Sequence, residues 1–386
     1  MGHALAAKGS SFFVAESSGD VIGFAQFVRR SSESVELTRI YVLPDRQRSG
    51  IGMQLLDAGL TEFAGEGLKQ LTVEVERDNG SGRRFYERAG FAEPRELTRE
   101  VPGHVLTLVE YRRPILARLL GGLAMGESPR WHENRLWFSD WGAREIVTAD
   151  LAGNREVVVR TPFDLPFCIA WLPDGRLLIV AGREGRVVRR ELDGALVTHA
   201  DLRGVSDKTW NEIVVDGRGN TYVNGIGGIV ALVAPDGSAR PLADGLAFPN
   251  GMAVTPDNAR LIVAESHAKK LTAFDIAGDG SLSDRRVWAD LGDGVPDGIC
   301  IDADGAVWYG DVPNKRCVRV REGGSVLQTI DLDRGCFACA LGGPEKTTLF
   351  LITAQWRGME HISEMARART GEVLTVKAPA PGVGWP

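Results

Sequence analysis

A turn followed by a short apolar strand recurs six times after about residue 114, and this repeat constrains the fold more than any other feature of the sequence. Successive repeats lie 41, 44, 40, 46 and 42 residues apart, counted between the residues that begin each apolar triplet. These residues are Leu136, Leu177, Thr221, Leu261, Val307 and Leu349. A period in the forties with β-turn punctuation is typical of a β-propeller, in which each repeat forms one four-stranded sheet. The repeats therefore predict an all-β, six-bladed β-propeller; the alternative, a β-sandwich, would not keep such regular spacing.

Residues 1–113 follow a different pattern, in which strands alternate with helices. Apolar residues at helical spacing predict an amphipathic helix after the segment DRQRSGIG; they are Met53, Leu56, Leu60 and Phe63. Strands are expected at 12–16, 21–29, 35–42 and 71–76, and a short second helix is expected to end at Gly90. The chain is therefore predicted to be multidomain, with an α/β domain at 1–113 and the all-β domain at 114–386.

Composition excludes several classes of partner. The chain has 386 residues and a net charge of −6, which gives no reason to expect binding to nucleic acid or to an anionic membrane. No apolar stretch is long enough to span a bilayer, and the start, MGHALAAKGSS, does not resemble a secretion signal. The five cysteines predict reduced thiols and a cytoplasmic protein. Cys336 and Cys339 form a lone CxxC, which favours small core residues over a redox or metal site.

Four polar residues occupy matching positions about ten residues before the apolar triplets. They are Glu127, Asn211, Asn250 and Asp297, in the segments GESPRW, TWNEIVVD, FPNGMAV and VPDGICID. Equivalent positions of different blades are related by rotation about the propeller axis, so these side chains are predicted to meet just ahead of the innermost strands, at the mouth of a central channel. The counterparts in the second and sixth repeats are Phe167 and Cys339, which supply no oxygen. Each residue alone could simply cap a turn, but four at one phase favour a shared site.

Two carboxylates that converge in a narrow channel repel each other unless a positive charge compensates. Carboxylate and amide oxygens together suit a hard divalent cation, such as calcium, magnesium or manganese. The pattern therefore predicts one bound divalent metal ion.

The same four motifs, in this order and spacing, resemble the senescence-marker-protein/gluconolactonase/luciferin-regenerating-enzyme family across about residues 115–386. The resemblance implies a six-bladed propeller with one divalent metal, calcium or alternatively zinc, manganese or magnesium. It places the metal ligands on Glu127, Asn250 and Asp297, and substrate-binding residues on Asn211 and on Thr209. The family's lactonases carry an arginine where this chain has Thr209, which puts an aldonolactone substrate in doubt. Lys208 is a neighbouring cation.

The chemistry that this resemblance implies is metal-assisted hydrolysis of a small-molecule lactone. The cation would polarise the lactone carbonyl, and a carboxylate would take the proton of the attacking water. Asp297 is the candidate base, because a carboxylate can both bind a metal and accept a proton.

The N-terminal domain resembles the GNAT acyltransferases. QRSGIG at 47–52 matches the cofactor loop of that family, and the segment from Asn79 to FYERAGF matches its second cofactor-side segment. Glycines let backbone amides approach a pyrophosphate, and the helix that follows presents its positive end. The resemblance implies an acetyl-CoA site formed by Tyr41, Val42, Gln47, Arg48, Ser49, Gly50, Ile51, Gly52 and Asn79. It also implies an amine acceptor, with Tyr86 as general acid and Glu36 as base, although Tyr86 could equally pack in the core and Glu36 be a solvated strand residue.

This N-terminal domain is predicted to be partial. GNAT domains normally begin with a strand and two helices that form much of the acceptor wall, and only eleven residues precede Phe12. Either the start lies upstream, or the domain is a relic, or another subunit completes it. An exposed sheet edge would then invite a homodimer.

Three classes of function follow. The first is a lactone hydrolase fused to an incomplete acetyl-CoA-dependent N-acyltransferase. The second is a metal or metabolite sensor that carries a non-catalytic acyl-CoA-binding domain, and turnover of lactones with metal would separate it from the first. The third is a scaffold, which would have no need for a ring of oxygen donors.

Overall fold

The computed structural model describes residues 9–66 and 68–385 and divides the chain into two compact units, Met1–Ala117 and Arg118–Pro386. The division falls just after Pro114, which ends a strand. Residues 1–8, which include most of the segment judged not to be a secretion signal, lie outside the described residues. No helix in the described part of the chain is long and apolar enough to cross a membrane.

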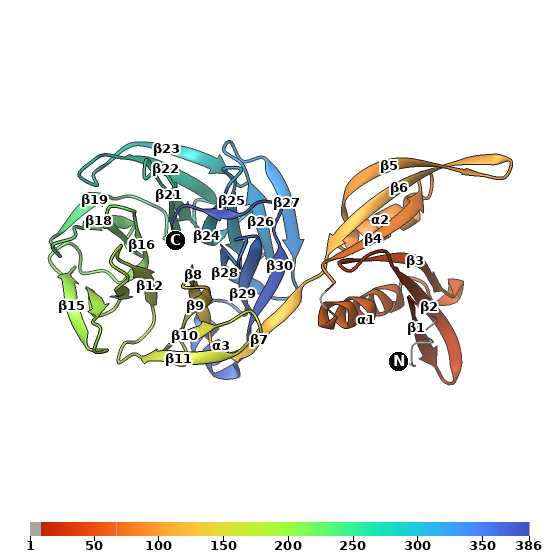
Figure 1. Cartoon of the computed structure of the whole chain (residues 1–386), viewed down its shortest axis with the longest axis horizontal. Coiled ribbons are helices and arrows are strands. Elements are labelled where there is room, and N and C mark those ends of the chain that lie inside the picture. Colours follow the sequence, from red (N-terminus) through yellow and green to blue (C-terminus); the bar gives the residue numbers. More distant parts are fainter. Residues whose placement is uncertain (1–8, 67, 386) are drawn as a thin grey trace. The chain divides into compact units, whose positions relative to one another are not determined.

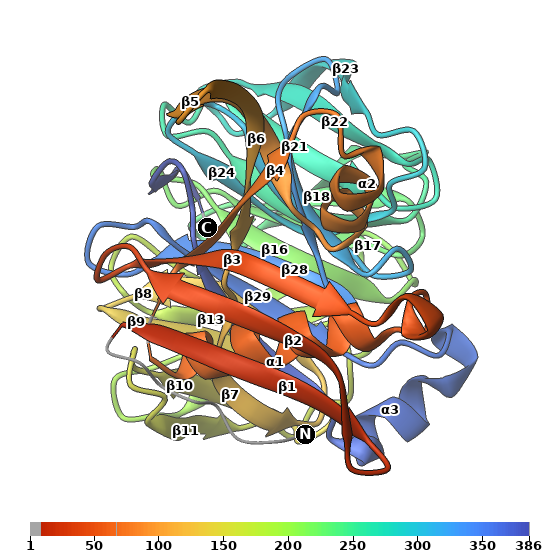
Figure 2. The ribbon, with the colours of Figure 1, turned by 90° about the vertical axis from the view of Figure 1, so that its right-hand side faces the viewer.

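The first unit is a six-stranded sheet with the strand order β1-β2-β3-β4-β6-β5 (Figures 1 and 2). Its strands are β1 (Ser10–Ser17), β2 (Asp20–Arg29), β3 (Ser34–Val42), β4 (Gln70–Glu76), β5 (Ala92–Val101) and β6 (His104–Pro114). β3 and β4 are parallel, and the other neighbours are antiparallel. The four strands expected from the sequence correspond to β1 to β4. The hairpin of β5 and β6 was not expected, because its apolar residues are interspersed with many charged ones.

Two helices and a 3₁₀ turn complete this unit: η1 (Pro44–Arg46), α1 (Ile51–Gly65) and α2 (Gly80–Arg88). α1 contacts β1, β2 and β3. Its buried face is formed by Leu55, Leu56 and Phe63, while Met53 and Leu60 are only partly buried beside it. The predicted helix is therefore present, but its core-facing side includes Leu55, which the prediction did not name. Asn79 caps α2, since its Oδ1 accepts a hydrogen bond from the Gly82 amide at 2.9 Å.

The second unit contains six antiparallel sheets in its described residues, arranged as a ring (Figure 1). The innermost strands are β8 (Gly126–His132), β12 (Phe167–Trp171), β16 (Trp210–Val215), β20 (Pro249–Val254), β24 (Pro296–Asp302) and β28 (Gly335–Gly342). Each innermost strand contacts the innermost strand of the next sheet, and β28 contacts β8, so the ring closes on itself.

Outward from these strands, each sheet continues with two more strands and then an outermost one. The second strands are β9 (Arg135–Asp140), β13 (Leu177–Ala181), β17 (Thr221–Gly225), β21 (Arg260–Glu265), β25 (Val307–Asp311) and β29 (Thr348–Ala354). The third are β10 (Glu145–Ala149), β14 (Arg186–Arg190), β18 (Ile229–Val233), β22 (Lys270–Ile276), β26 (Arg316–Val320) and β30 (Gly371–Lys377). The outermost are β11 (Arg155–Arg160), β15 (Leu196–Asp201), β19 (Ala239–Ala243), β23 (Leu282–Asp290), β27 (Val326–Asp331) and β7 (Ala117–Leu123).

The two ends of the second unit meet in the sheets. β7, its first strand, is the outermost strand beside β30, its last long one. The short β31 (Gly382–Val383) adds a fifth strand beside β24, and Trp385 bridges to Val254. Residues between β29 and β30 form η2 (Met359–His361) and α3 (Ile362–Ala368).

The repeat found in the sequence corresponds to the second strand of each sheet. Each predicted triplet begins at the first or second residue of one of these strands. Almost all their residues are buried, so the apolar triplets are the core of the sheets. The prediction of an α/β part followed by a mostly-β part is confirmed.

Candidate metal and lactone site

Four innermost strands carry an oxygen-bearing side chain as their second residue. These are Glu127 in β8, Asn211 in β16, Asn250 in β20 and Asp297 in β24. The prediction placed them just ahead of the strands, and they lie inside them instead. At or directly after each residue, the pairing with the second strand shifts register, which marks a β-bulge. A bulge bends its strand and re-aims a side chain, so four irregular strands bring these groups to one end of the ring, called here the ligand end.

The two remaining innermost strands carry no oxygen-bearing side chain at this position. β12 begins at Phe167 and pairs with β13 without a register shift. β28 has a shift after Cys336, and Cys336 is its second residue. The sequence repeat had placed Cys339 at this position, which is wrong because β28 begins earlier than the spacing implied. Cys339 lies deeper along the strand, where its Sγ is 3.8 Å from that of Cys300. All five cysteines are buried and unpaired.

A glycine follows the oxygen-bearing residue in β20 and in β24. A Cβ added at Gly251 would lie 2.5 Å from the backbone oxygen of Asp297, and one added at Gly298 would lie 2.4 Å from the Cβ of Ala338. Neighbouring innermost strands thus approach too closely at the bulges for a side chain. The Asn-Gly and Asp-Gly pairs therefore serve close strand packing rather than a turn.

Amide side chains link two of the four residues. Asn211 Nδ2 donates a hydrogen bond to Asn250 Oδ1 at 3.4 Å. Asn250 Nδ2 donates to Ser266 Oγ at 3.4 Å, and its backbone oxygen accepts a bond of 2.5 Å from Asn224 Nδ2. Asn224 lies in β17 and is buried. These contacts fix the direction of the Asn250 side chain.

The carboxyl groups at the ligand end influence one another. Burial raises the pKa of Glu127 well above its usual range, and the charges of Asp297 and Glu212 raise it further. Burial also raises the pKa of Asp297, with the charge of Glu212 adding to it and a hydrogen bond from Asn250 opposing it. Negative charge on any of these carboxyl groups therefore disfavours ionisation of the others, and a bound cation would allow Glu127 and Asp297 to ionise together.

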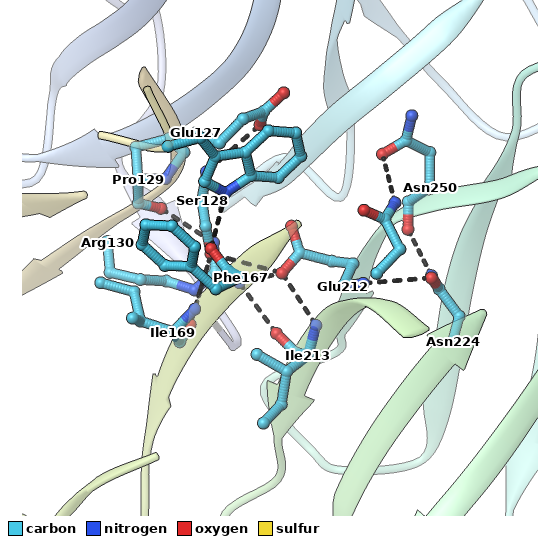
Figure 3. Close-up of polar contacts among 12 residues, drawn as sticks. Glu127, Ser128, Pro129, Arg130, Phe167, Ile169, Glu212, Ile213, Asn224 and Asn250 are labelled. Atoms are coloured by element: carbon cyan, nitrogen blue, oxygen red, sulfur yellow. Dashed lines mark hydrogen bonds and ion pairs between the residues drawn. The ribbon is translucent and has the colours of Figure 1, made fainter. Parts of the chain in front are cut away.

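Behind these residues lies a buried ion pair that the sequence did not reveal. Glu212 Oε1 accepts hydrogen bonds from Arg130 at 3.1 Å, from the Ile213 amide at 2.8 Å and from Ser128 Oγ at 3.3 Å (Figure 3). The Arg130 and Glu212 side chains are each only 6% exposed. Ser128 has a φ of 52° and its hydroxyl accepts a bond from the Ile169 amide at 3.0 Å. The pair joins β8 to β16 directly behind Glu127 and Asn211.

The candidate ligands fit a hard divalent cation. Two carboxylates and the amide oxygen of Asn250 form an all-oxygen set, which suits calcium, magnesium or manganese better than zinc, for which nitrogen and sulfur ligands predominate. Within residues 9–66 and 68–385, no group of three or more His, Cys, Asp or Glu side chains is placed to hold a metal ion. The fit therefore depends on asparagine oxygens as well as on carboxylates.

The two neighbours of Asn211 that the sequence singled out lie just before β16. Thr209 is partly buried and its backbone oxygen accepts a bond from Ile226. The Lys208 ammonium is exposed and lies 3.8 Å from a carboxylate oxygen of Asp207.

In the first unit, the segment QRSGIG leads sharply into α1. Arg48 has a φ of 63° and Gly50 one of 87°. The first hydrogen bond within the helix runs from the Gln54 amide to the Gly50 oxygen, so amides of the first turn have no acceptor within the helix. Gln47 and Ser49 brace the segment through bonds to the backbone oxygens of Val42 and Arg46. This geometry leaves amides and a helix N-terminus available at Gln47 to Gly52, and binding of an anion there stays a prediction.

The remaining candidates of this unit have defined surroundings. Tyr41 is 64% exposed and stacks on Phe24. Tyr86 is buried against Phe91 and Phe85, and burial raises its pKa to about 12. The carboxylate of Glu36 accepts a bond of 2.5 Å from Arg30.

Comparison with known proteins matches both units. The SMP-30/gluconolactonase/LRE-like region model matches residues 125–355, more than half of the chain, and the acetyltransferase (GNAT) domain model matches residues 8–93. Pentonolactonase XacC of Haloferax volcanii is 28% identical over 247 residues, which cover 60% of this chain and 81% of that protein. Regucalcin of Xenopus laevis is 26% identical over 275 residues, 65% of this chain and 90% of that protein.

The first unit has a separate relative. Mycothiol acetyltransferase of Streptomyces coelicolor is 38% identical over 85 residues, which cover 21% of this chain and 27% of that enzyme.

Solved structures share the fold of the second unit. A luciferin-regenerating enzyme superimposes with a TM-score of 0.61 at 18% identity, covering 70% of this chain and 98% of that one. A calcium-binding regucalcin of Agrobacterium tumefaciens superimposes with a TM-score of 0.56 at 19% identity, covering 69% and 93%. The chain thus belongs to the SMP-30/gluconolactonase/LRE-like family and carries a GNAT acetyltransferase domain at its N-terminus.

Proposed function

We propose that the second unit is a six-bladed propeller that hydrolyses a lactone with the help of one divalent cation. The observation that carries this proposal is the placement of Glu127, Asn250 and Asp297 at the same position of three innermost strands, each at a bulge. These residues would hold the cation, which is calcium or alternatively magnesium, manganese or zinc. The family, and a pentonolactonase among the relatives, support a lactone as substrate.

The reaction adds water to the ring ester and opens it to a hydroxy acid. The cation, when bound, supplies Lewis-acid polarisation of the lactone carbonyl. Asp297 accepts a proton from the attacking water, because its carboxylate has a second oxygen that can act as a base beside the candidate cation. The ring carbon–oxygen bond then breaks, and the departing ring oxygen takes up the proton that Asp297 had accepted. Asn211, with Thr209 beside it, orients the substrate.

A hydrolysis screen of the full chain over sugar and alkyl lactones, with and without each metal, tests this function. We expect turnover of at least one lactone that stops with a chelator and returns with the metal. If the metal-loaded protein turned over no lactone while still binding metal tightly, the alternative function would be favoured, a metal or metabolite sensor.

For the first unit we propose acetyl-CoA binding at Gln47–Gly52, with Tyr41, Val42 and Asn79 beside the cofactor. Support comes from the positive-φ segment that precedes α1 and from the GNAT match. In transfer to an amine, the amine nitrogen would attack the thioester carbon, the carbon–sulfur bond would break, and Tyr86 would give its proton to the leaving thiolate. Glu36 would take the amine proton only after release from Arg30. Pairing of two copies along β1, the edge strand of the sheet as described, is a further proposal of ours.

Replacing Gly50 with alanine is expected to weaken acetyl-CoA binding roughly tenfold, because a left-handed conformation costs a residue with a Cβ about 1–2 kcal/mol. Gly103 is a matched control, since its φ of 76° is also positive and an added Cβ would likewise meet nothing within 4 Å. Calorimetry on the full chain should show weaker binding in Gly50→Ala and unchanged binding in Gly103→Ala. Equal loss in both variants would point to general strain instead of a cofactor loop.

A further inference from the structure

A separate pocket of about 480 Å³ opens at the ligand end of the ring. Its walls come from the hairpin between β9 and β10, from the segment before β12 and from α3. All three segments lie at the end where β8 and β12 begin. The pocket thus lies on the same side of the second unit as Glu127.

Trp141 connects this pocket to the candidate metal site. Its ring lines the pocket, and its Nε1 donates a hydrogen bond of 2.6 Å to the backbone oxygen of Phe167, the first residue of β12. Its own amide donates to the oxygen of Met125, two residues before Glu127. Trp141 is only 8% exposed, so its packing fixes its position at the place where the pocket adjoins the starts of β8 and β12.

α3 is packed firmly at the pocket rather than projecting from the surface. Met365 is 4% exposed and belongs to the same apolar cluster as Trp141, Phe163 and Phe167. A Cβ added at Gly142 would lie 2.8 Å from the Cβ of Ala366, so hairpin and helix are in close contact. α3 is therefore anchored on the core, while Ser363, Arg367 and Arg369 remain exposed at the pocket.

The charges of the pocket are predominantly positive. Three arginines line it, Arg144, Arg367 and Arg369, against a single carboxylate, Asp164. Arg144 forms an ion pair with Asp164, and Arg369 Nε donates to the Gly122 oxygen at 3.0 Å. Arg367 has no hydrogen bond or ion pair within the described ranges. The nearest acidic residue on its own helix, Glu364, lies 3.4 Å from His361. The guanidinium of Arg367 therefore lies beside that of Arg369, which has only part of its donors in use. Such a pair of guanidinium groups can bind a carboxylate or a phosphate.

We propose that this pocket is an anion subsite for the lactone, so that the substrate class of the second unit is a lactone that carries a carboxylate or phosphate remote from the ring ester. The inference rests on the proposed hydrolase function and specifies its substrate. The ring ester occupies the ligand end beside Asp297, and the anionic substituent passes Trp141 to Arg367 and Arg369. Ser363 adds a hydroxyl donor to the same wall.

The test compares three lactones on the full-length, metal-loaded chain: neutral D-glucono-1,5-lactone, D-glucaro-1,4-lactone with a carboxylate, and 6-phospho-D-glucono-1,5-lactone. We expect a higher kcat/KM for one of the two anionic lactones than for the neutral one. Replacing Arg367 with glutamine should lower the ratio of anionic to neutral kcat/KM about tenfold, through KM, because a charge-assisted bond made equally in ground and transition states is lost.

Two further variants sharpen this comparison. Asp164→Asn removes the anion that competes for Arg144 and should move the ratio in the opposite direction. Arg155→Gln is a matched control, because it removes the same charge from the outermost strand of the first sheet, away from the pocket. If Arg155→Gln lowered the ratio of anionic to neutral kcat/KM as much as Arg367→Gln, a long-range effect of net charge would explain both results. That outcome would overturn the subsite.

Binding without turnover separates this inference from the proposed function. Calorimetric titration with glucarate and with 6-phosphogluconate, the opened products, should give measurable affinity that falls in Arg367→Gln and falls with added salt. Hydrolysis of the neutral lactone with no anionic preference and no binding of either acid would overturn the subsite while leaving the hydrolase function intact. Absence of all lactone hydrolysis, with acid binding that depends on Arg367, would overturn the hydrolase function instead.

Discussion

Replacing Asp297 with asparagine is expected to lower the kcat of lactone hydrolysis by roughly 10²–10⁴-fold, the loss typical of a removed general base. Asparagine has nearly the same shape and can keep its place in the bulge of β24, so the fold should be retained. It accepts no proton from water and brings no negative charge to the candidate cation. Steady-state kinetics at saturating lactone and saturating metal should show the defect in kcat, which excess substrate cannot restore.

Asp193→Asn provides a matched control for this experiment. Asp193 is an exposed turn residue whose Oδ1 accepts a bond from the Ala195 amide at 2.9 Å, a bond that asparagine can also accept. This variant should keep full activity. Near-normal kcat in Asp297→Asn would contradict the role of Asp297 as base, and recovery at high metal concentration would reduce that role to metal binding.

Replacing Arg130 with methionine is expected to destabilise the second unit by about 3–5 kcal/mol, because the change leaves Glu212 charged and buried without its partner. At about 2–4 °C per kcal/mol for domains of roughly this size, the fall in Tm should be roughly 6–20 °C. Among the described residues, Glu212 would retain only the Ile213 amide and the Ser128 hydroxyl as hydrogen-bond partners. Thermal unfolding followed by circular dichroism measures the change.

The double variant Arg130→Met with Glu212→Gln tests the cause of this loss. Glutamine can still accept the bonds of Ile213 and Ser128 but carries no charge, so the double variant should regain much of the lost Tm. If both variants melted at the same temperature, lost packing of the arginine stem, rather than an unpaired charge, would explain the effect.

The oxygen-bearing residues of the candidate site could be found from sequence because the fold repeats. One turn-and-strand pattern recurs at nearly constant spacing, and Asn211, Asn250 and Asp297 stand at one phase of it. Residues at the same position of each repeat can therefore be expected to meet, even when no distance between them is known. The same reasoning went wrong for Cys339, where a longer innermost strand shifted the phase by three residues, so that Cys336 takes the position.

The buried ion pair and the bulges that hold these residues in place could not be predicted from the repeat. Arg130 and Glu212 are 82 residues apart and belong to different sheets, and nothing in their local sequence indicates that they pair. The bulges are also hidden, since Asn-Gly and Asp-Gly commonly mark turns. The close approach of the Asp297 backbone to Gly251 explains why a glycine is needed there. Long-range packing, and not local preference, decides these features.

In the first unit, more of the structure than in the second could be predicted from short segments of sequence. QRSGIG predicted the start of α1, and Asn79 preceded α2, because glycine conformation and helix capping are local properties. The hairpin of β5 and β6 was missed although its strands are consecutive, since its apolar residues are interspersed with many charged ones. Tyr86 packs against Phe85 and Phe91, and its role as general acid stays a prediction.

Metal stoichiometry tests the central claim most directly. Calorimetric titration and elemental analysis of the full chain should give one divalent cation per chain, with binding that weakens at acidic pH because protons compete for Glu127 and Asp297, whose pKa values are raised. The double variant Glu127→Gln with Asp297→Asn should lose this ion while keeping its circular dichroism spectrum. Unchanged metal content in the folded double variant would contradict the site proposed at the ligand end of the ring.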